Sequence, residues 1–323
     1  MIREIKKLAA AFRFGGIKAA YYRAKGKNEF KRYLYQVAKK TDPKDYPKLL
    51  KKRFELETGK KLDLDHPQTY NEKIQWMKLY DSTPLKTQLA DKYRVREWIR
   101  EKIGDQYLIP LLGVWYKFDD IDFDSLPDQF ALKCNHGCGY NYVVKDKKAM
   151  NMEYARKKFE YWLKRNYTFV SCRLELHYKD IKPCIIAEKY IEQMDGNLYD
   201  YKIHVFNGEP KIIQVIGDRD LNHHKAREAF FDPDWNQVKL ANHTYESYDI
   251  LPKKPEKLQQ MLQIAEKLGS EFTYVRVDLY DLSGDIKFGE MTFAPKSGFG
   301  KWGGKGTVFS QLMDLSTKPS TVS

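Results

Sequence analysis

Hydrophobic residues recur at helical spacing through the first hundred positions. A stripe at the N-terminus is flanked by basic residues and stops at Gly15-Gly16, which predicts a helix over residues 1–14. A second basic run, residues 17–40, is rich in tyrosine. Helical spacing continues to Gly104, with Thr83 as an N-cap candidate and Pro84 at the first helical position. The N-terminal stripe consists of Ile2, Ile5, Leu8, Ala9 and Phe12.

Beyond Gly104 the pattern changes to short β-rich runs separated by turn signals such as Asn207-Gly208. Helical spacing returns only over residues 154–163 and 255–268. Helices followed by mostly antiparallel strands with interleaved helices indicate the α+β class. The expected strands lie within residues 107–115, 129–134, 141–144, 184–191, 199–206, 211–217, 272–280 and 286–293.

Composition and length are those of a globular protein. The 323 residues are 42% hydrophobic and 31% charged, which excludes a disordered chain or a small disulfide scaffold. No run approaches the roughly 20 apolar residues of a membrane-spanning helix, and no secretory signal follows the N-terminal charges. We therefore expect a cytoplasmic protein with reduced cysteines. Cys134 and Cys138 resemble half of a zinc site, but no second pair follows at finger-like spacing, so a tight loop is the better interpretation.

The positive charge is concentrated at one end of the chain. The formal net charge is +13, and residues 1–60 hold 18 Lys and Arg against 6 Asp and Glu. A nucleic-acid enzyme would spread its basic residues over a groove, so no nucleic-acid partner is expected. The basic amphipathic segment 1–41 has two interpretations: it binds an anionic membrane surface at the inner face, or it packs on the body with its lysines in water.

Two acidic residues interrupt apolar runs on a predicted hairpin. Asp278 lies between Val277 and Leu279, a turn follows at Ser283-Gly284, and Glu290 lies in the returning strand. Two carboxylates on paired strands repel each other unless a positive charge compensates them. A divalent cation meets that need, and Mg²⁺ favours one or two carboxylates plus phosphate oxygens. The alternative is a carboxylate pair bridged by Arg276 or a lysine.

A lysine and a small-residue loop point to phosphate binding. Lys133 ends a predicted strand directly before residues 134–139, and small residues allow backbone N–H groups to approach a polyphosphate closely. The apolar run 184–191 turns polar at its end, where a planar base can stack, and Asp200 opens the next strand.

The order of these features resembles that of the ATP-grasp enzymes, specifically the TupA-like branch associated with surface-polysaccharide synthesis. The resemblance covers roughly residues 67–300, and the leader lies outside it. It rests on the stretches Ala90-Asp91-Lys92-Tyr93, Leu126-Pro127-Asp128-Gln129-Phe130, Tyr201-Lys202-Ile203-His204-Val205-Phe206-Asn207-Gly208 and Gly289-Glu290-Met291-Thr292-Phe293.

The resemblance implies an α+β fold in which two subdomains clasp ATP and Mg²⁺. Lys92 and Lys133 would hold the α and β phosphates, and the loop with Asn135, His136, Gly137 and Gly139 would close over the γ phosphate. Asp278 and Glu290 would ligate Mg²⁺; Thr292 stands where the family has an asparagine ligand. The other implied nucleotide contacts are Glu188, Lys189, Tyr190 and Ile191 on the adenine strand, Asp200 at the ribose, and Lys202.

The implied reaction is carboxylate–amine ligation through an acyl phosphate, with a uronic-acid-containing saccharide and an amino acid as substrates. Arg276 would stabilise the transferring phosphoryl group or the tetrahedral oxyanion, Arg219 is a second candidate for phosphate binding, and Lys296 would hold the substrate carboxylate. An ATP-grasp phosphotransferase acting on a sugar hydroxyl is the first alternative. The second is a non-enzymatic basic adaptor that binds membrane or RNA.

The sequence order of these features predicts five regions. They are the basic segment 1–41, a helical region 42–127, a small lid subdomain 128–198, a C-terminal subdomain 199–315 that carries the metal site, and a disordered tail 316–323.

Overall fold

The structure is a computed structural model that describes residues 2–191, 198–220, 225–240, 244–301 and 307–316. The chain divides into two compact units, each assembled from segments distant in the sequence. Unit 1 comprises residues 1–84, 166–179 and 294–310, and unit 2 comprises residues 85–165, 180–293 and 311–323. The predicted regions follow the order of the sequence, whereas this division follows packing.

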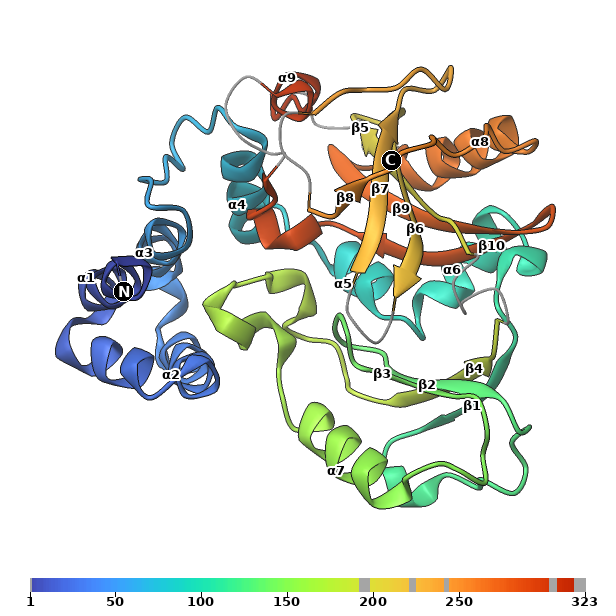
Figure 1. Ribbon diagram of the computed structural model, residues 1–323, viewed down its shortest axis with the longest axis horizontal. Coiled ribbons are helices and arrows are strands. Elements are labelled where there is room, and N and C mark those ends of the chain that lie inside the picture. Colours follow the sequence, from blue (N-terminus) through green and yellow to red (C-terminus); the bar gives the residue numbers. More distant parts are fainter. Residues whose placement is uncertain (1, 192–197, 221–224, 241–243, 302–306, 317–323) are drawn as a thin grey trace. The chain divides into compact units, whose positions relative to one another are not determined.

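Unit 2 contains a six-stranded sheet with the order β10-β9-β5-β6-β7-β8 (Figure 1). Neighbouring strands are antiparallel, apart from the parallel pair β7 and β8. This matches the expected antiparallel texture, although β7 and β8 were not predicted from the sequence. The strands are β5 (Asp200–Phe206), β6 (Glu209–Asp220), β7 (Lys225–Phe231), β8 (Glu246–Ser247), β9 (Tyr274–Leu282) and β10 (Asp285–Thr292).

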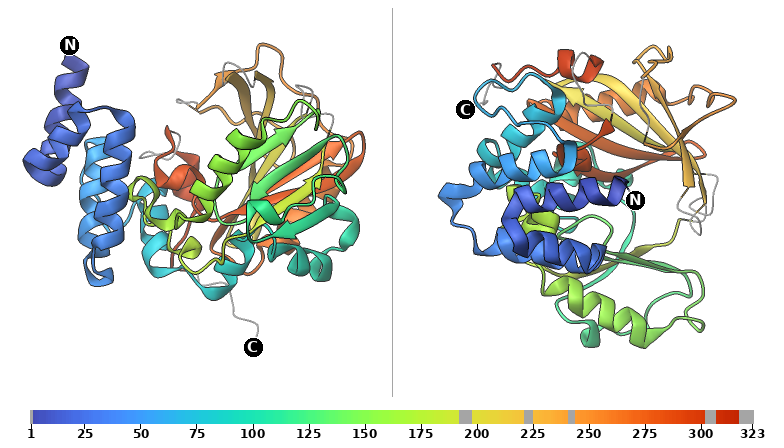
Figure 2. Two further views of the ribbon diagram at one scale, coloured as in Figure 1. Left: turned by 90° about the horizontal axis from the view of Figure 1, so that it is seen from below. Right: turned by 60° about the vertical axis from the view of Figure 1, so that its left-hand side comes forward.

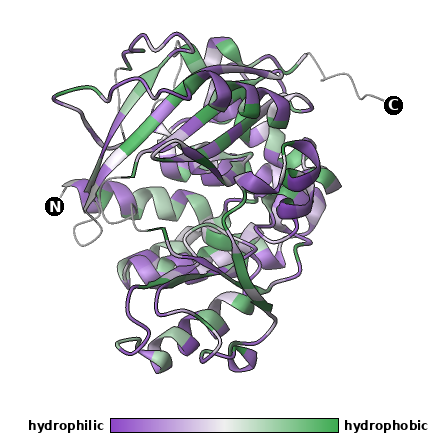
Figure 3. Ribbon diagram, turned by 90° about the vertical axis from the view of Figure 1, so that its right-hand side faces the viewer, coloured by the Kyte–Doolittle hydropathy of each residue, from purple (hydrophilic) through white to green (hydrophobic). Residues whose placement is uncertain are grey.

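Apolar and polar residues alternate along strands of this sheet (Figure 3), and successive side chains of a strand point to opposite faces. On β9, Val275, Val277 and Leu279 belong to the hydrophobic core, whereas Arg276 and Asp278 between them do not. Helix α8 (Leu258–Gly269) packs against the apolar face through residues such as Met261 and Leu268. The opposite face carries the polar side chains of Arg276 and Asp278, together with buried apolar residues such as Ile212 on β6.

A four-stranded antiparallel sheet with the order β1-β4-β2-β3 forms the rest of the β-structure of unit 2. Its strands are β1 (Leu111–Trp115), β2 (Phe130–Cys134), β3 (Asn141–Val144) and β4 (Ile185–Lys189). Helix α7 (Met152–Leu163) contributes Phe159 to their shared core. The predicted lid subdomain starts at residue 128. The sheet also includes β1, which pairs with β4 and precedes that residue.

Helices α5 and α6 precede the four-stranded sheet in the chain, and the first of them starts where the sequence predicts. Helix α5 (Pro84–Ala90) begins at Pro84, and α6 (Val95–Lys102) ends just before Gly104. The shorter helices are η2 (Asp105–Tyr107), η3 (Phe118–Asp120), η4 (Tyr167–Cys172), η5 (Leu176–Tyr178), η7 (Pro295–Gly298) and α9 (Val308–Leu312).

Unit 1 is built around a helical core. Helices α1 (Ile2–Ala24), α2 (Lys27–Lys40) and α3 (Tyr46–Thr58) lie side by side (Figure 2), with η1 (Pro43–Asp45) before α3. Phe30, Leu34, Leu50 and Phe54 are among its buried residues. Helix α4 (Tyr70–Tyr80) begins at a capping box between Thr69 and Glu72. None of the described helices is long and apolar enough to cross a membrane.

The leader helix α1 is interrupted at Gly15 and Gly16, as predicted, and Gly16 has a φ of 66°. The buried residues are Ala11, Phe14 and Ala19, which pack in the core of unit 1. The predicted apolar stripe is different: Ile5 is 59% exposed and Phe12 is 54% exposed. The leader thus contributes to a core and also presents large apolar side chains to solvent.

A strained turn follows β10 and carries Lys296. Lys296 and Ser297 have φ values of 50° and 55°, which costs free energy in non-glycine residues. The turn is fixed within unit 1, because Gln75 Nε2 donates to the carbonyls of Ser297 at 3.0 Å and Gly298 at 2.9 Å. The buried Lys78 Nζ also donates to the Ser297 carbonyl at 3.2 Å. Burial lowers the pKa of Lys78 to about 7.

All four cysteines are free, and Cys138 alone is exposed. Burial raises the pKa of the Cys172 and Cys184 thiols to about 12, so these groups pack as small apolar residues.

Candidate functional site

The hairpin of β9 and β10 places two carboxylates opposite each other, as predicted. Asp278 pairs with Glu290 after a one-residue register shift between Phe288 and Glu290. A Cβ on Gly289 at this bulge would lie 3.1 Å from the Asp278 carbonyl oxygen, so the close approach favours glycine. Without the extra residue, position 289 would face Asp278. The bulge therefore brings Glu290 onto the polar face beside Asp278.

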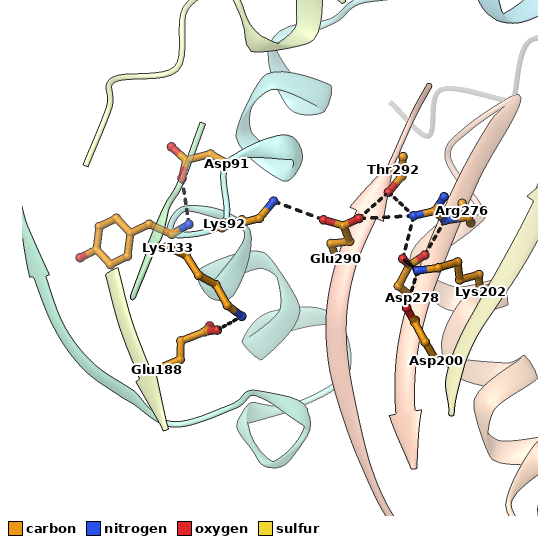
Figure 4. A network of polar contacts seen from close by, with 11 residues as sticks. Asp91, Lys92, Lys133, Glu188, Asp200, Lys202, Arg276, Asp278, Glu290 and Thr292 are labelled. Atoms are coloured by element: carbon orange, nitrogen blue, oxygen red, sulfur yellow. Dashed lines mark hydrogen bonds and ion pairs between the residues drawn. The ribbon is translucent and has the colours of Figure 1, made fainter. Parts of the chain in front are cut away.

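Arg276 joins the two carboxylates and the neighbouring hydroxyl (Figure 4). Its Nε donates to Asp278 Oδ1 at 2.6 Å and its Nη2 to Asp278 Oδ2 at 2.7 Å, a bidentate pair. The same Nη2 lies 3.3 Å from Glu290 Oε1 and 3.0 Å from Thr292 Oγ1. Arg276 thus bridges the two carboxylates, which was the alternative to a divalent cation.

Two lysines complete the cluster. Lys92 Nζ lies 3.2 Å from Glu290 Oε2. Lys202 contacts Asp278 and lies 2.7 Å from Asp200 Oδ2. The side chains come from β5, β9, β10 and the segment before α6, and they face one another in Figure 4. We refer to Lys92, Asp200, Lys202, Arg276, Asp278 and Glu290 as the charge cluster.

The pKa values reflect this mutual compensation. Burial alone would raise the pKa of Glu290, but Lys92 and Arg276 lower it to about 2. Asp278 is 1% exposed, and its burial raises the pKa of its carboxyl despite Arg276 and Lys202. Burial would lower the pKa of Lys202, but Asp200 and Asp278 raise it. Each lysine is thus held in its charged form by a carboxylate.

Lys92 is positioned by the turn that precedes α6. Asp91 Oδ1 accepts hydrogen bonds from the N–H groups of Tyr93 at 2.8 Å and Arg94 at 3.1 Å. The Lys92 N–H donates to the carbonyl of Asn135 at 3.0 Å. The chain that carries Lys92 is therefore tied to the loop after β2.

The predicted phosphate loop, residues 134–139, is buried up to Gly137 and exposed at Cys138 and Gly139. The Asn135 side chain binds the backbone of Lys182 and Cys184 at 3.0 and 2.7 Å. His136 Nε2 lies 3.0 Å from the Trp162 carbonyl, and burial lowers the pKa of its imidazole. Both side chains are buried and bonded to the protein itself. Gly139 is exposed and has a φ of 73°.

Lys133 and Glu188 meet on adjacent strands of the four-stranded sheet. Lys133 Nζ lies 2.6 Å from Glu188 Oε2. Arg96 Nη1 approaches Glu188 Oε1 at 3.2 Å. Arg96 was not predicted from the sequence. The only signal there was its position four residues after Lys92, which would place both on one face of a helix. Asp91, which had no predicted role, is the turn residue that orients Lys92.

The remaining predicted nucleotide contacts have the following surroundings. The Lys189 N–H donates to the Pro110 carbonyl at 2.9 Å, and its side chain is exposed. Tyr190 and Ile191 are buried, and Ile191 packs against Ile109. The Asp200 carboxylate, predicted at the ribose, lies 2.7 Å from Lys202 Nζ.

The oxygen ligands at the hairpin fit Mg²⁺. Asp278, Glu290 and Thr292 offer only oxygen atoms, and Thr292 Oγ1 lies 3.2 Å from Glu290 Oε1. Within the described ranges, no group of three or more His, Cys, Asp or Glu residues is arranged to hold a metal ion alone. A cation here would therefore need ligands from a substrate, such as phosphate oxygens.

For two predicted catalytic residues the structure gives only their local surroundings. Lys296 lies in unit 1, where its side chain is exposed. Arg219 lies in β6, but its side chain falls outside the described part of the structure.

Comparison with known proteins gives one family match. A family model described as TupA-like ATPgrasp matches residues 72–307. No curated protein matches the chain. Similar chains of solved structures include D-alanine–D-alanine ligase from Bacillus anthracis, with 16% identity, a TM-score of 0.36 and coverage of 64% of this chain and 57% of that one.

Two further solved structures are similar to this chain. The ATP-grasp ligase PsnB, complexed with a minimal precursor, has 12% identity and a TM-score of 0.36, covering 66% of this chain and 55% of PsnB. D-cycloserine synthetase DcsG has 14% identity and a TM-score of 0.40, covering 84% and 78%. The chain thus spans little more than half of the D-alanine ligase and of PsnB.

Replacing Glu290 with glutamine is expected to tighten the binding of ATP in the absence of Mg²⁺. The change removes one negative charge and releases Lys92, which can then donate to a phosphate oxygen. A charge-assisted hydrogen bond of this kind corresponds to roughly tenfold in affinity. The stimulation of binding by Mg²⁺ should disappear in the same variant. Calorimetric titration with ATP, with EDTA or with Mg²⁺, measures both effects.

The exposed Glu271, paired with Lys102, provides a matched control, Glu271→Gln, which should behave as the wild type. The assignment of Glu290 is wrong if Glu290→Gln binds Mg²⁺-free ATP no better and still responds to Mg²⁺.

His204 is expected to make stability sensitive to acid. Its ring is fully buried, with Nδ1 2.7 Å from the Tyr274 hydroxyl, and burial holds its pKa well below 6.5. Below pH 6.5 the unfolded chain therefore binds a proton that the folded chain rejects. The free energy of unfolding should fall by up to about 1.4 kcal/mol per pH unit from this group.

Urea unfolding at pH 7, 6 and 5 tests this difference. We expect His204→Gln to have a shallower pH dependence than the wild type, while His66→Gln, at an exposed position, keeps the wild-type slope. Equal slopes for His204→Gln and the wild type would contradict the assignment.

Proposed function

Because the chain belongs to the TupA-like ATP-grasp family, we propose that it is an ATP- and Mg²⁺-dependent ligase that joins a carboxylate to an amine. The membership confirms the predicted α+β ATP-grasp fold. For the substrates we propose a uronic acid of a cell-surface polysaccharide or its precursor, together with an amino acid, on the strength of the resemblance that the sequence carries.

The observation that supports this proposal most directly is the charge cluster. Three cations, Lys92, Lys202 and Arg276, contact carboxylates on β5, β9 and β10. A nucleotide polyphosphate with Mg²⁺ presents the complementary charges, since phosphates pair with the cations and the metal pairs with the carboxylates. The cluster thus holds the two sets of ligands that such a nucleotide requires.

The proposed reaction has two steps. A carboxylate oxygen of the acceptor attacks the γ phosphorus of ATP, and the bond from that phosphorus to the bridging oxygen of ADP breaks. The amine nitrogen then attacks the acyl carbon of the acyl phosphate, inorganic phosphate leaves, and the proton of the amine passes to water. Bound Mg²⁺ would neutralise charge on the phosphate oxygens.

The side chains of this chain orient the reactants and stabilise charge. Lys92, Lys133 and Lys202 bind phosphate oxygens, and Arg276 stabilises the transferring phosphoryl group. Lys296, presented by its fixed turn, binds the substrate carboxylate, and Arg219 binds phosphate. The neutral, buried His204 is not required as a base.

Product analysis tests the reaction type. We expect ADP and phosphate to form only when a uronate and an amine are both present, as pools of uronates and amino acids, with Mg²⁺. Asp278→Asn should lose turnover by at least about a hundredfold, because it removes a charge that holds the metal.

A phosphorylated sugar formed without any amine would establish the alternative phosphotransferase instead. Absence of nucleotide binding by the intact chain would favour the non-enzymatic adaptor and contradict the proposed ligase.

We also propose that the leader holds the enzyme reversibly at an anionic membrane surface on the cytoplasmic side. The outward side of α1 carries Ile5, Phe12 and Ile17, the last 80% exposed, beside exposed lysines such as Lys6 and Lys18. Apolar side chains combined with basic residues are typical of helices that lie in a lipid interface. Because Ala11, Phe14 and Ala19 belong to the core of unit 1, deleting residues 1–41 would damage the fold, and point substitutions are the better test.

Replacing Lys6 and Lys18 with glutamine should weaken binding to anionic vesicles about thirtyfold at low salt. Each cation near an anionic surface contributes about 1 kcal/mol, and this contribution is screened by salt. Flotation with phosphatidylglycerol-containing and pure phosphatidylcholine vesicles measures the effect.

The exposed pair Lys253 and Lys254 provides a control with the same change in net charge, and the control variant should bind as the wild type does. If the wild type ignores anionic vesicles, or both double variants lose binding equally, the leader is not the membrane-binding surface.

A further inference from the structure

Glu188 is held by two cations from different elements. Its side chain is 9% exposed, and its two oxygens bind Lys133 at 2.6 Å and Arg96 at 3.2 Å. Lys133 lies on β2, two residues from Ala131, which pairs with Glu188 in the sheet. Arg96 comes from α6 and is 11% exposed. One buried carboxylate is thus shared by a predicted phosphate ligand and an arginine that has no predicted role.

Arg96 has a second attachment, to the backbone of the segment before β1. Its Nη2 donates to the carbonyl of Ile109 at 2.8 Å, directly before Pro110, whose carbonyl accepts the Lys189 N–H at 2.9 Å. The guanidinium group therefore joins α6 to the chain before β1 and to the side chain of β4. A planar group with several donors can hold both contacts at once. Arg96 is fixed in place, whereas Lys133 ends in a single flexible ammonium group.

The charges on these three residues impose a condition on nucleotide binding. If Lys133 moves to a phosphate, Glu188 loses one of its two cations. A buried carboxylate without a partner is strongly destabilising. If Lys133 were the only cation in contact with Glu188, Glu188 would therefore retain it. With Arg96 still in contact, the carboxylate stays compensated and Lys133 is free to leave.

We propose that Arg96 is a positioning residue that keeps Glu188 compensated while Lys133 transfers from Glu188 to the nucleotide phosphates. The inference rests on the proposed ATP-dependent function. Arg96 acts through Glu188 and Lys133 and does not itself need to touch the nucleotide. Its effect is on the free energy of releasing Lys133, so it acts on nucleotide affinity more than on the chemical step.

The test compares ATP affinity in a set of variants of the full chain by calorimetry with Mg²⁺. Arg96→Gln should weaken ATP binding at least about tenfold, because Glu188 then holds Lys133. Arg96→Lys should remain within about threefold of the wild type, because it keeps the charge. Adding Glu188→Gln to Arg96→Gln should restore most of the affinity, because the carboxylate that retains Lys133 is gone.

Arg100→Gln is the matched control, on the same helix but at an exposed ion pair with Asp105, and should bind ATP as the wild type does. In steady-state kinetics we expect Arg96→Gln to raise the KM for ATP with little change in kcat, which a general loss of structure would not produce. Unchanged affinity in Arg96→Gln, equal damage in Arg96→Lys, or no recovery in the double variant would each overturn the proposal.

A measurement without nucleotide separates this proposal from the proposed function. The rate of acetylation of Lys133, followed by site-resolved mass spectrometry, should be lower in Arg96→Gln than in the wild type and should recover in the double variant. If these rates follow the prediction but the wild type binds no ATP, the proposed function fails and the Arg96–Glu188–Lys133 relation stands. If the rates are equal in all variants, the relation itself is wrong.

Discussion

The compensation of buried charge at the end of the β9–β10 hairpin is the constraint on which the rest of the site depends. Asp278 is almost fully buried, and a carboxylate in that position is destabilising unless cations contact it. Arg276 provides a bidentate contact from the same strand, and Lys202 provides a second contact from β5. The bulge at Gly289, the pairing of β5 with β9 and the turn that carries Lys92 all bring charges to this point.

The cluster is also arranged so that its ion pairs can be exchanged together. Lys92, Lys202 and Arg276 balance the negative charges of Asp200, Asp278 and Glu290. Phosphate oxygens can take over as partners of the cations, and a divalent metal can take over as partner of the carboxylates. Every buried charge then keeps a partner. Binding either ligand alone would leave one set uncompensated. It follows that metal and nucleotide should bind this site with positive coupling, which is a property of the charge arrangement rather than of any single residue.

Local patterns in the sequence predicted the parts of the site that depend on neighbouring residues. The hairpin could be predicted because Asp278 and Glu290 interrupt two apolar runs, and a clear turn signal lies between those runs. The roles of Asn135 and His136 were not readable, because their partners, Lys182, Cys184 and Trp162, lie at least 26 residues away. For the same reason the sequence does not indicate that three separate segments assemble into unit 1. Spacing determines which face a residue occupies, but not which distant segment meets that face.

The leader shows why periodicity alone left two interpretations open. Helix α1 has apolar residues on two sides, and an amphipathic pattern does not indicate which side is covered. In the structure the side with Ala11, Phe14 and Ala19 packs in the core. Phe12 and Ile17 remain exposed. A group of large apolar side chains in solvent is typical of an interaction surface. Their exposure beside lysines therefore argues that packing within this chain is not the only role of the leader.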